Sequence, residues 1–312
     1  MTESAPYLGD GPTGGFARWL TAADGVRLRA VFWPVTGARG TVVILPGRTE
    51  HAEKYGPTAA RLAAGGYAAA AVDWRGQGLA QRLTPDPRKG HVGRFSDYQL
   101  DLLAFCAAIG AEGLAAPRFL LAHSMGGCIG LRGLMGGLDV AAAAFSAPMW
   151  GLNVPGGQAA VFGAGFGLVA RAGLRQRYAP PPASGPVCYV ATAPFAGNTL
   201  TTDPAEWDLM QSQLRRTPEL MVAGPTIGWV AEALAETRAL AALPSPAVPC
   251  LTGLGGNERI VNIPAIRARM ARWPGGTLLP VPGAEHELLM EAAPLREAFL
   301  SRVLALFDSQ PA

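Results

Sequence analysis

The stretch that decides the fold of this chain is RFLLAHSMGGC, residues 118–128. Its apolar run 119–122 is typical of a buried parallel strand, and a helical pattern follows the serine. A serine between a buried strand and a helix, with small residues at Ala122 and Gly126, indicates a nucleophile elbow. In such a turn the backbone of Ser124 is strained, which raises the hydroxyl above the sheet and above the N-terminus of the helix.

Ala122 stands where the common Gly-x-Ser-x-Gly pattern has its first glycine, and alanine is still small enough for the turn. The alternative interpretation is that Ser124 only caps the helix, with glycines that allow close packing. This segment favours catalysis without deciding it, so the other site residues have to be sought elsewhere in the chain.

Strands and helices alternate along much of the chain. Apolar runs typical of buried strands occupy residues 41–45, 67–72, 119–122, 141–145, 248–252 and 277–281. Helical patterns occupy residues 55–64, 96–111, 125–135, 227–240, 264–273 and 293–307. An antiparallel hairpin, residues 16–21 and 26–33 joined at Asp24-Gly25, precedes them. This order predicts an α/β fold with a mostly parallel central sheet and helices on both of its faces.

The alternation stops between residues 149 and 225, in a stretch rich in glycine, proline and alanine. We interpret this stretch as an insertion that caps the sheet. The predicted organisation is a core made of residues 16–148 and 226–309, a cap or lid of residues 149–225, and an N-terminal tail of residues 1–15.

The composition argues against several classes of protein. Only 16% of the residues are charged and the net charge is +3, which speaks against nucleic-acid binding. The cysteines have no metal-ligand spacing, so we expect free thiols and neither a metal nor a cofactor. They are Cys106, Cys128, Cys188 and Cys250. Residues 1–15 do not have the pattern of a secretory signal, and no apolar run is long enough to span a bilayer, so we expect a cytoplasmic enzyme.

A serine nucleophile needs a base, and the chain has four histidines. The side chain of His123 is expected to point away from Ser124, and His51 and His91 precede the serine. Hydrolases of this architecture have the histidine last along the chain, after the acid. His286, directly after the last predicted strand, is therefore the predicted general base.

The acid is found by elimination. Glu258 is the only carboxylate just beyond the penultimate strand, in a glycine-rich loop from which its side chain can reach the imidazole. The alternatives are a surface ion pair between Glu258 and Arg259, and Asn257 as the group that orients the histidine. An amide does not stabilise an imidazolium as a carboxylate does, so Glu258 is the predicted acid of the triad.

Two backbone N–H groups are predicted to bind the oxyanion. One belongs to Met125, directly after Ser124, and the other to Arg48, in the loop that follows the strand at residues 41–45. Gly47 allows the backbone to turn so that the amide of Arg48 faces the serine.

Several segments together resemble a known family. They are residues 46–51 (PGRTEH), 73–78 (DWRGQG), 90–92 (GHV) with 95–98 (FSDY), 122–127 (AHSMGG), 146–149 (SAPM), 224–226 (GPT) with 229–230 (WV), 257–261 (NERIV) and 283–287 (GAEHE). Through them the chain resembles the monoacylglycerol lipase and bacterial lysophospholipase branch of the α/β-hydrolase family, from about residue 16 to the C-terminal helix. The 224–230 segment and the glutamate acid look more like the bacterial, L2-like lysophospholipases.

The resemblance implies an α/β-hydrolase fold, a triad of Ser124, Glu258 and His286, and a lid over an acyl pocket at residues 149–225. It implies hydrolysis of a carboxylic ester of a lipid, a lysophospholipid or a monoacylglycerol, through an acyl-enzyme on Ser124. No cofactor is implied. Transient contact between the cap and a membrane surface is also compatible with it, which would place the enzyme at the inner face of the membrane.

Within the cap, an apolar stretch at residues 159–170 is a candidate lining of the acyl pocket. Its larger apolar residues are Val161, Phe162, Phe166, Leu168 and Val169. The alternative is a helix that simply packs onto the sheet. Three arginines beyond it, Arg171, Arg175 and Arg177, are either a site for a lipid phosphate or a solvated helix face.

Three departures from the family pattern leave the substrate open. Pro46 and Gln77 stand where histidines are common, and Ala80 where a serine is common.

Two rival functions remain within the same fold, a general carboxylesterase and a peptidase of the aminopeptidase type. The peptidase would need carboxylates in the cap to hold the ammonium group of its substrate, and Asp203, Glu206 and Asp208 are available. A non-catalytic binding protein is the remote alternative, and it would be expected to lack one member of the triad.

Overall fold

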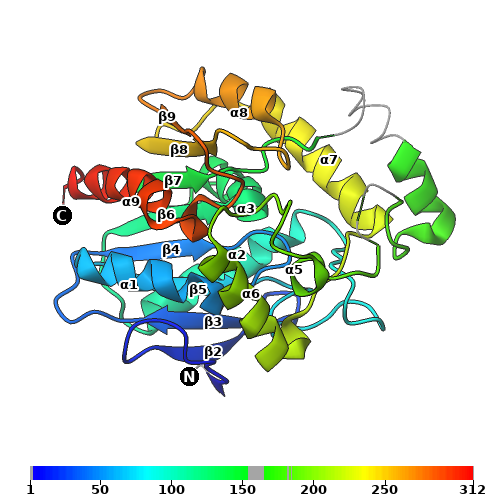
Figure 1. Cartoon of the computed structure of the whole chain (residues 1–312), viewed down its shortest axis with the longest axis horizontal. Helices are drawn as coiled ribbons and strands as arrows, with labels where there is room; N and C mark the ends of the chain where they lie inside the picture. The colour runs from blue at the N-terminus through cyan, green and yellow to red at the C-terminus, as the bar shows by residue number, and fades with distance from the viewer. Residues whose placement is uncertain (1–2, 154–164, 181–182, 184, 312) are drawn as a thin grey trace.

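A nine-stranded sheet forms the centre of the molecule in the computed structural model, which describes residues 3–153, 165–180, 183 and 185–311 (Figure 1). The strand order is β1-β2-β3-β5-β4-β6-β7-β8-β9. The strands are β1 (Glu3–Ala5), β2 (Phe16–Thr21), β3 (Arg27–Trp33), β4 (Thr41–Leu45), β5 (Ala68–Asp73), β6 (Arg118–His123), β7 (Ala142–Ser146), β8 (Cys250–Gly255) and β9 (Thr277–Val281). Neighbours are antiparallel from β1 to β5 and parallel from β5 to β9. The predicted mostly parallel sheet is therefore confirmed.

The central strands are buried on both faces, which is why they appear in the sequence as continuous apolar runs. Every residue of β4 is buried. Because successive side chains of a strand point to opposite faces, Val43 and Leu45 join one hydrophobic cluster and Val42 and Ile44 join the other. The sheet thus separates two apolar cores.

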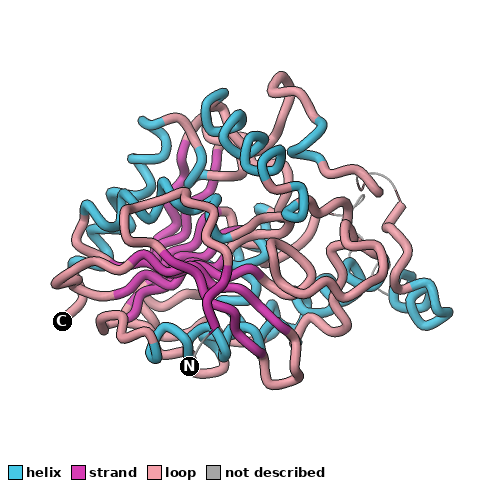
Figure 2. Tube along the Cα trace, turned by 90° about the horizontal axis from the view of Figure 1, so that it is seen from below, coloured by secondary structure: helices cyan, strands magenta, loops and turns pink. Residues whose placement is uncertain are grey.

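Helices cover both faces of the twisted sheet, whose strands cross the middle of the molecule in Figure 2. They are α1 (Gly56–Ala64), α2 (Asp97–Ala111), α3 (Ser124–Met135), α7 (Ile227–Ala242), α8 (Ile263–Met270) and α9 (Ala293–Asp308). α1 and α9 pack on one face, and α2, α3, α7 and α8 share the core on the other. Among the described residues, no helix combines the length and the apolarity needed to cross a membrane.

Between β7 and α7 the described residues add no strand to the sheet and form short helices instead. These are η3 (Ala170–Leu174), α5 (Tyr189–Thr192), α6 (Pro204–Arg216) and η4 (Pro218–Leu220). α5 and α6 pack together around a small cluster of Leu200, Trp207 and Met210. The sequence analysis did not predict α6, although Asp203 caps it and Pro204 begins it.

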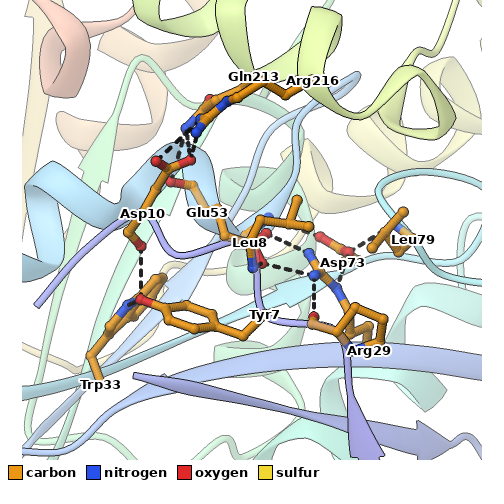
Figure 3. Close-up of polar contacts among 12 residues, drawn as sticks. Tyr7, Leu8, Asp10, Arg29, Trp33, Glu53, Asp73, Leu79, Gln213 and Arg216 are labelled. Atoms are coloured by element: carbon orange, nitrogen blue, oxygen red, sulfur yellow. Dashed lines mark hydrogen bonds and ion pairs between the residues drawn. The ribbon is translucent and has the colours of Figure 1, made fainter. Parts of the chain in front are cut away.

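The N-terminal segment, expected as a tail of residues 1–15, contributes β1 to the sheet and also contacts α6. The carboxylate of Asp10 accepts hydrogen bonds from Gln213, at 3.0 Å, and from Arg216, at 2.9 Å, both on α6 (Figure 3). This segment therefore joins the first strands of the sheet to the helix above them.

A fully buried charge cluster lies beneath the N-terminal segment (Figure 3). Arg29 of β3 donates to Asp73 at the end of β5, at 2.8 Å, and to Glu53, at 2.7 Å, in η1 (Ala52–Tyr55). The three side chains have no exposed surface. The backbone N–H groups of Leu8 and Ala52 donate to Glu53 and Asp73, respectively. Because each charge is paired and hydrogen-bonded, the cluster can stay buried and fixes η1 against the sheet.

Candidate active site

Ser124 occupies a sharp turn between β6 and α3. Its φ angle of 47° lies in the left-handed region, which is uncommon for a residue other than glycine. A Cβ atom at Gly126 would come within 2.1 Å of the carbonyl oxygen of Leu45, so only glycine fits there. Ala122 is fully buried beside Leu45 and Phe145 of the neighbouring strands. The small residues therefore allow the strained turn that presents the serine.

His286 and Glu258 come from different loops and meet side by side. Glu258 follows β8, His286 follows β9, and Nδ1 of the imidazole lies 2.7 Å from Oε2 of the carboxylate. The other carboxylate oxygen accepts from the backbone N–H groups of Ile260, at 2.6 Å, and Val261, at 3.0 Å. Burial acts to raise the pKa of Glu258, but the hydrogen bonds from His286 and from the loop outweigh it, so the pKa is lowered. The carboxylate is thus ionised and held beside the imidazole.

The two alternatives for Glu258 are not what the structure shows. Arg259 pairs with Glu285, at 2.9 Å, and not with Glu258. The side-chain amide of Asn257 is exposed and donates to the carbonyl of Gly283. Glu258 is the group that contacts the imidazole.

Ser124 and His286 lie on the wall of the same cavity, which has a volume of about 260 Å³. Most of its other lining is apolar and comes from both the core and the segment between β7 and α7. These side chains are Met149, Leu152, Tyr189, Val190, Leu200, Trp229, Ile260 and Val261. Arg48, Glu50, His123 and Glu287 add polar surface on the core side. The cavity can therefore hold an apolar chain next to the serine.

The loop after β4, which carries Arg48, is held from two sides. The amide of Gln77 donates to the carbonyl of Gly47, at 2.8 Å, and accepts from the N–H of Thr49, at 3.3 Å. The carboxylate of Glu50 accepts from the N–H of Gly47. Thr49 itself has a φ angle of 67°, a left-handed conformation that these contacts stabilise. The loop is thereby fixed on the cavity wall next to α3, where the N–H of Met125 lies in the unpaired first turn.

A buried ion cluster supports this loop, and the sequence analysis did not find it. Nζ of Lys54 contacts Glu50, at 2.6 Å, and Glu287, the residue after His286. The hydroxyl of Tyr55 donates to Glu50, at 2.6 Å. Burial acts to raise the pKa of Glu50, but Lys54 and the nearby His123 lower it to about 2. Glu50 and Lys54 are four residues apart, which could have suggested their pairing, whereas Glu287 is too distant in sequence to be recognised.

His123 lies closer to the site than expected. Its side chain was expected to point away from Ser124, yet its ring lies on the cavity wall, 4.7 Å from the ring of His286. Nδ1 lies 3.0 Å from the carbonyl oxygen of Ser146, and Nε2 lies 3.6 Å from Glu50. Burial lowers the pKa of His123 to about 3, so this ring is neutral near neutral pH and forms a fixed wall beside the imidazole.

Glu50, His123 and Glu287 place three possible ligand atoms within 4.8 Å of one another. The ammonium group of Lys54 already contacts both carboxylates, so it supplies the positive charge that a metal ion would bring.

The described residues of the apolar stretch 159–170 do not line the cavity. Val161 and Phe162 lie outside the described residues. Leu168 is 72% exposed, Val169 is also exposed, and neither they nor Phe166 line the cavity. From the 149–225 segment, the cavity is lined instead by Met149, Leu152, Tyr189, Val190 and Leu200.

Of the three arginines that follow this stretch, the two with described side chains, Arg175 and Arg177, form no joint phosphate site. The side chain of Arg171 lies outside the described part of the chain. Arg175 pairs with Glu232, at 3.1 Å, and Arg177 is exposed.

Comparison with known proteins supports the same fold. The Hydrolase_4 family model, described as serine aminopeptidase, S33, matches residues 36–293. The chain is 33% identical over 300 residues to lysophospholipase L2 of Escherichia coli (strain K12), across 93% of this chain and 86% of that protein. It is 26% identical over 309 residues to the probable lysophospholipase L2 of Haemophilus influenzae, across 97% of this chain and 94% of that protein.

Among solved structures, the chain is similar to a soluble variant of monoglyceride lipase from Saccharomyces cerevisiae, bound to a substrate analog. The TM-score is 0.74 at 18% sequence identity, across 97% of this chain and 99% of that chain. This similarity, together with the sheet topology, confirms the predicted α/β-hydrolase fold.

Proposed function

We propose that this chain, a carboxylic ester hydrolase, cleaves the ester of a monoacyl lipid through an acyl-enzyme on Ser124. The chain belongs to the Hydrolase_4 family of α/β-hydrolases. The observation that carries this proposal is the 2.7 Å contact between Glu258 and His286 on the cavity wall that also carries Ser124. A hydroxyl, an imidazole and a carboxylate in this arrangement have the roles of nucleophile, base and orienting acid.

In the proposed reaction, His286 accepts the proton of Ser124 as the hydroxyl oxygen attacks the ester carbonyl carbon. Glu258 holds the imidazole by Nδ1 and stabilises its positive charge. His286 then protonates the departing alcohol, which leaves an acyl-serine. A water molecule, deprotonated by His286, attacks the acyl-serine and releases the carboxylic acid.

The negative charge on the carbonyl oxygen is stabilised by the backbone N–H groups of Met125 and Arg48. The first lies at the N-terminus of α3, and the second lies in the loop that Gln77 and Glu50 hold in place. Because neither group has to move during the reaction, their stabilisation is available as the charge develops.

A lipid substrate is supported by the cavity and by the relatives. The cavity wall is mostly apolar, and the relatives matched over most of their length are named lysophospholipases. The alternative function is that of a general carboxylesterase, whose activity would depend less on the length of the acyl chain.

The name of the family favours the rival aminopeptidase, but the cap carboxylates do not. Asp203 caps α6, Glu206 pairs with Arg296, and the side chain of Asp208 is exposed. None of the three is among the residues that line the cavity. A substrate ammonium group therefore finds no free carboxylate from this set.

We assign residues 149–225 as a lid whose outer surface meets lipid transiently. Exposed apolar side chains in this segment support the assignment, and they include Leu168, Leu174 and Val187. We propose accordingly that the enzyme works in the cytoplasm, at the inner face of the membrane. Sedimentation with vesicles tests this contact, and Leu168→Asp should weaken it.

The function is tested with purified protein and Ser124→Ala. The wild type should hydrolyse a short nitrophenyl ester, lysophosphatidylcholine and a monoacylglycerol, and should react with a fluorophosphonate probe. Ser124→Ala should lose both the turnover and the labelling while keeping its thermal unfolding temperature. Ser301→Ala, an exposed serine of α9, is the matched control and should behave as the wild type. Turnover that survives in Ser124→Ala, or a clear preference for an aminoacyl amide, would overturn the proposal.

A further inference from the structure

Arg48 has a charged side chain on the cavity wall, and no carboxylate of the described residues pairs with it. Its Nη2 donates to the carbonyl oxygen of Ala223, at 2.8 Å, and its guanidinium lies 5.1 Å from the ring centroid of Trp229. Its Nε is buried and has no hydrogen-bond partner among the described residues. Within the described part of the chain it forms no ion pair, whereas the buried guanidinium groups of Arg29 and Arg75 each contact two carboxylates.

The charge of Arg48 is present at neutral pH and is not cancelled by its surroundings. Burial lowers the pKa of Arg48 to about 10, which is still well above neutrality. The carboxylates on the same cavity wall, Glu50 and Glu287, are both paired with Lys54. A buried donor without a partner is costly and calls for an explanation, and an anion bound in the cavity would provide one.

The position of Arg48 relates this charge to the proposed reaction. Its backbone N–H is the proposed oxyanion donor, so the ester carbonyl lies beside its main chain. Its side chain then runs along the cavity wall to Trp229 and Ala223, where α7 begins. In a lysophospholipid, the three carbons of glycerol separate the ester oxygen from the phosphate oxygen. In arginine, three methylene groups separate the backbone from the guanidinium, so the two spacings are similar.

We propose that the side chain of Arg48 binds the phosphate of a lysophospholipid head group and makes the site select this substrate over a neutral monoacylglycerol. The guanidinium suits the task because its planar, forked donors match two phosphate oxygens and stay charged. This inference rests on the proposed ester hydrolysis at Ser124. Arg48 then has two roles: its backbone N–H binds the oxyanion, and its side chain binds the head group.

The first test compares two substrates with the same acyl chain, 1-palmitoyl-lysophosphatidylglycerol and 1-palmitoylglycerol, in mixed micelles of a neutral detergent. The ratio of their kcat/KM values is measured for the wild type, Arg48→Lys and Arg48→Gln. Arg48→Gln should lower this ratio at least tenfold, chiefly through KM of the phospholipid, and Arg48→Lys should lie between. Equal losses on both substrates would mean that Arg48 serves only the loop or the oxyanion, and would overturn the inference.

Arg175→Gln is the matched control, because Arg175 lies at the same junction of core and cap but is paired with Glu232. Its substrate ratio should equal that of the wild type. A fall as large as in Arg48→Gln would show a general effect of charge and contradict the assignment to Arg48.

The second test measures binding without turnover, so it separates this inference from the proposed function. Calorimetric titration of Ser124→Ala with sn-glycerol 3-phosphate should show binding that glycerol lacks and that the added Arg48→Gln substitution removes. Inorganic phosphate distinguishes a head-group site from a free-phosphate site, and it should bind more weakly than glycerol 3-phosphate. If the wild type does not hydrolyse the lipids but the binding of glycerol 3-phosphate depends on Arg48, only the proposed function is contradicted. Binding that does not depend on Arg48, or a preference for inorganic phosphate, would sink the inference.

Discussion

Glu258 divides its carboxylate between His286 and its own loop. Oε2 lies 2.7 Å from Nδ1 of the imidazole, and Oε1 accepts from the N–H groups of Ile260 and Val261. The loop therefore fixes the orientation of the carboxylate relative to the imidazole ring. The negative charge that would stabilise an imidazolium is thus in position before a substrate binds.

Replacing that charge should slow the reaction strongly. Glu258→Gln keeps the size of the side chain but removes the negative charge, so we expect kcat to fall by about 10²- to 10⁴-fold, by analogy with the loss of a triad acid. Steady-state assays with a nitrophenyl ester measure this fall in kcat. Asn257→Ala is the control, since this exposed amide donates to the carbonyl of Gly283 and does not contact the imidazole of His286, and its activity should stay unchanged. A Glu258→Gln protein with near wild-type kcat would remove Glu258 from the triad.

Gln77 should matter for kcat although it does not touch the triad. Gln77→Ala leaves the carbonyl of Gly47 and the N–H of Thr49 without their partner, so the amide of Arg48 would lose its fixed direction. We expect kcat to fall about tenfold with little change in KM, a smaller effect than the 10²- to 10³-fold cost of losing an oxyanion donor outright. Gln81→Ala, in the same loop but bonded to β3, should leave kcat unaltered. Full activity in Gln77→Ala would mean that the loop holds its shape without this amide.

Lys54 should be required for stability. Lys54→Met leaves the buried carboxylates of Glu50 and Glu287 without their positive partner, which is expected to lower the free energy of unfolding by about 3–5 kcal/mol. Urea unfolding monitored by circular dichroism measures the change. The exposed Arg94, paired with Asp97 at the surface, provides the control, and Arg94→Met should cost less than about 1 kcal/mol. If adding Glu287→Gln to Lys54→Met restores no stability, the loss does not come from the unpaired charge.

His51 should make the fold sensitive to acid. Burial lowers the pKa of His51 from 6.5 to about 4, so between these values the unfolded chain binds a proton that the folded chain does not. The free energy of unfolding therefore decreases as the pH falls through this window, by up to about 1.4 kcal/mol per pH unit for each such proton. In His51→Gln this part of the slope should disappear. Denaturant titrations at several values between pH 4 and 6.5 measure it, and an unchanged slope would show that His51 does not carry the effect.

Short-range chemistry made much of the fold predictable from the sequence. The elbow at Ser124 follows from small residues at fixed spacing, and His286 follows from the chain order of such folds. The predicted strands and helices of the core match the observed ones within a few residues, because buried strands appear as apolar runs and helices as periodic ones.

Contacts that depend on partners distant in the sequence could not be predicted. β1 has only three residues, Glu-Ser-Ala, without any apolar pattern, and it forms because β2 offers an edge. The contacts of Gln77 with the loop after β4 join residues some thirty positions apart, and those of Lys54 with Glu287 span 233 positions. α6 is the exception, since Asp203 and Pro204 marked its start, and its mostly polar sequence hid it.

The link between Asp10 and α6 has a practical meaning for anyone preparing this enzyme. A bulky affinity tag placed before β1 would strain the contacts of Asp10 with Gln213 and Arg216 and so disturb α6, which packs on α5, the helix whose Tyr189 and Val190 line the cavity. α9 packs on the same face of the sheet as α1, and its C-terminal end lies at the left edge of Figure 1, away from α6. A tag that follows α9 leaves these contacts intact. Comparing the turnover of the two tagged forms would therefore show whether the N-terminal segment affects access to Ser124.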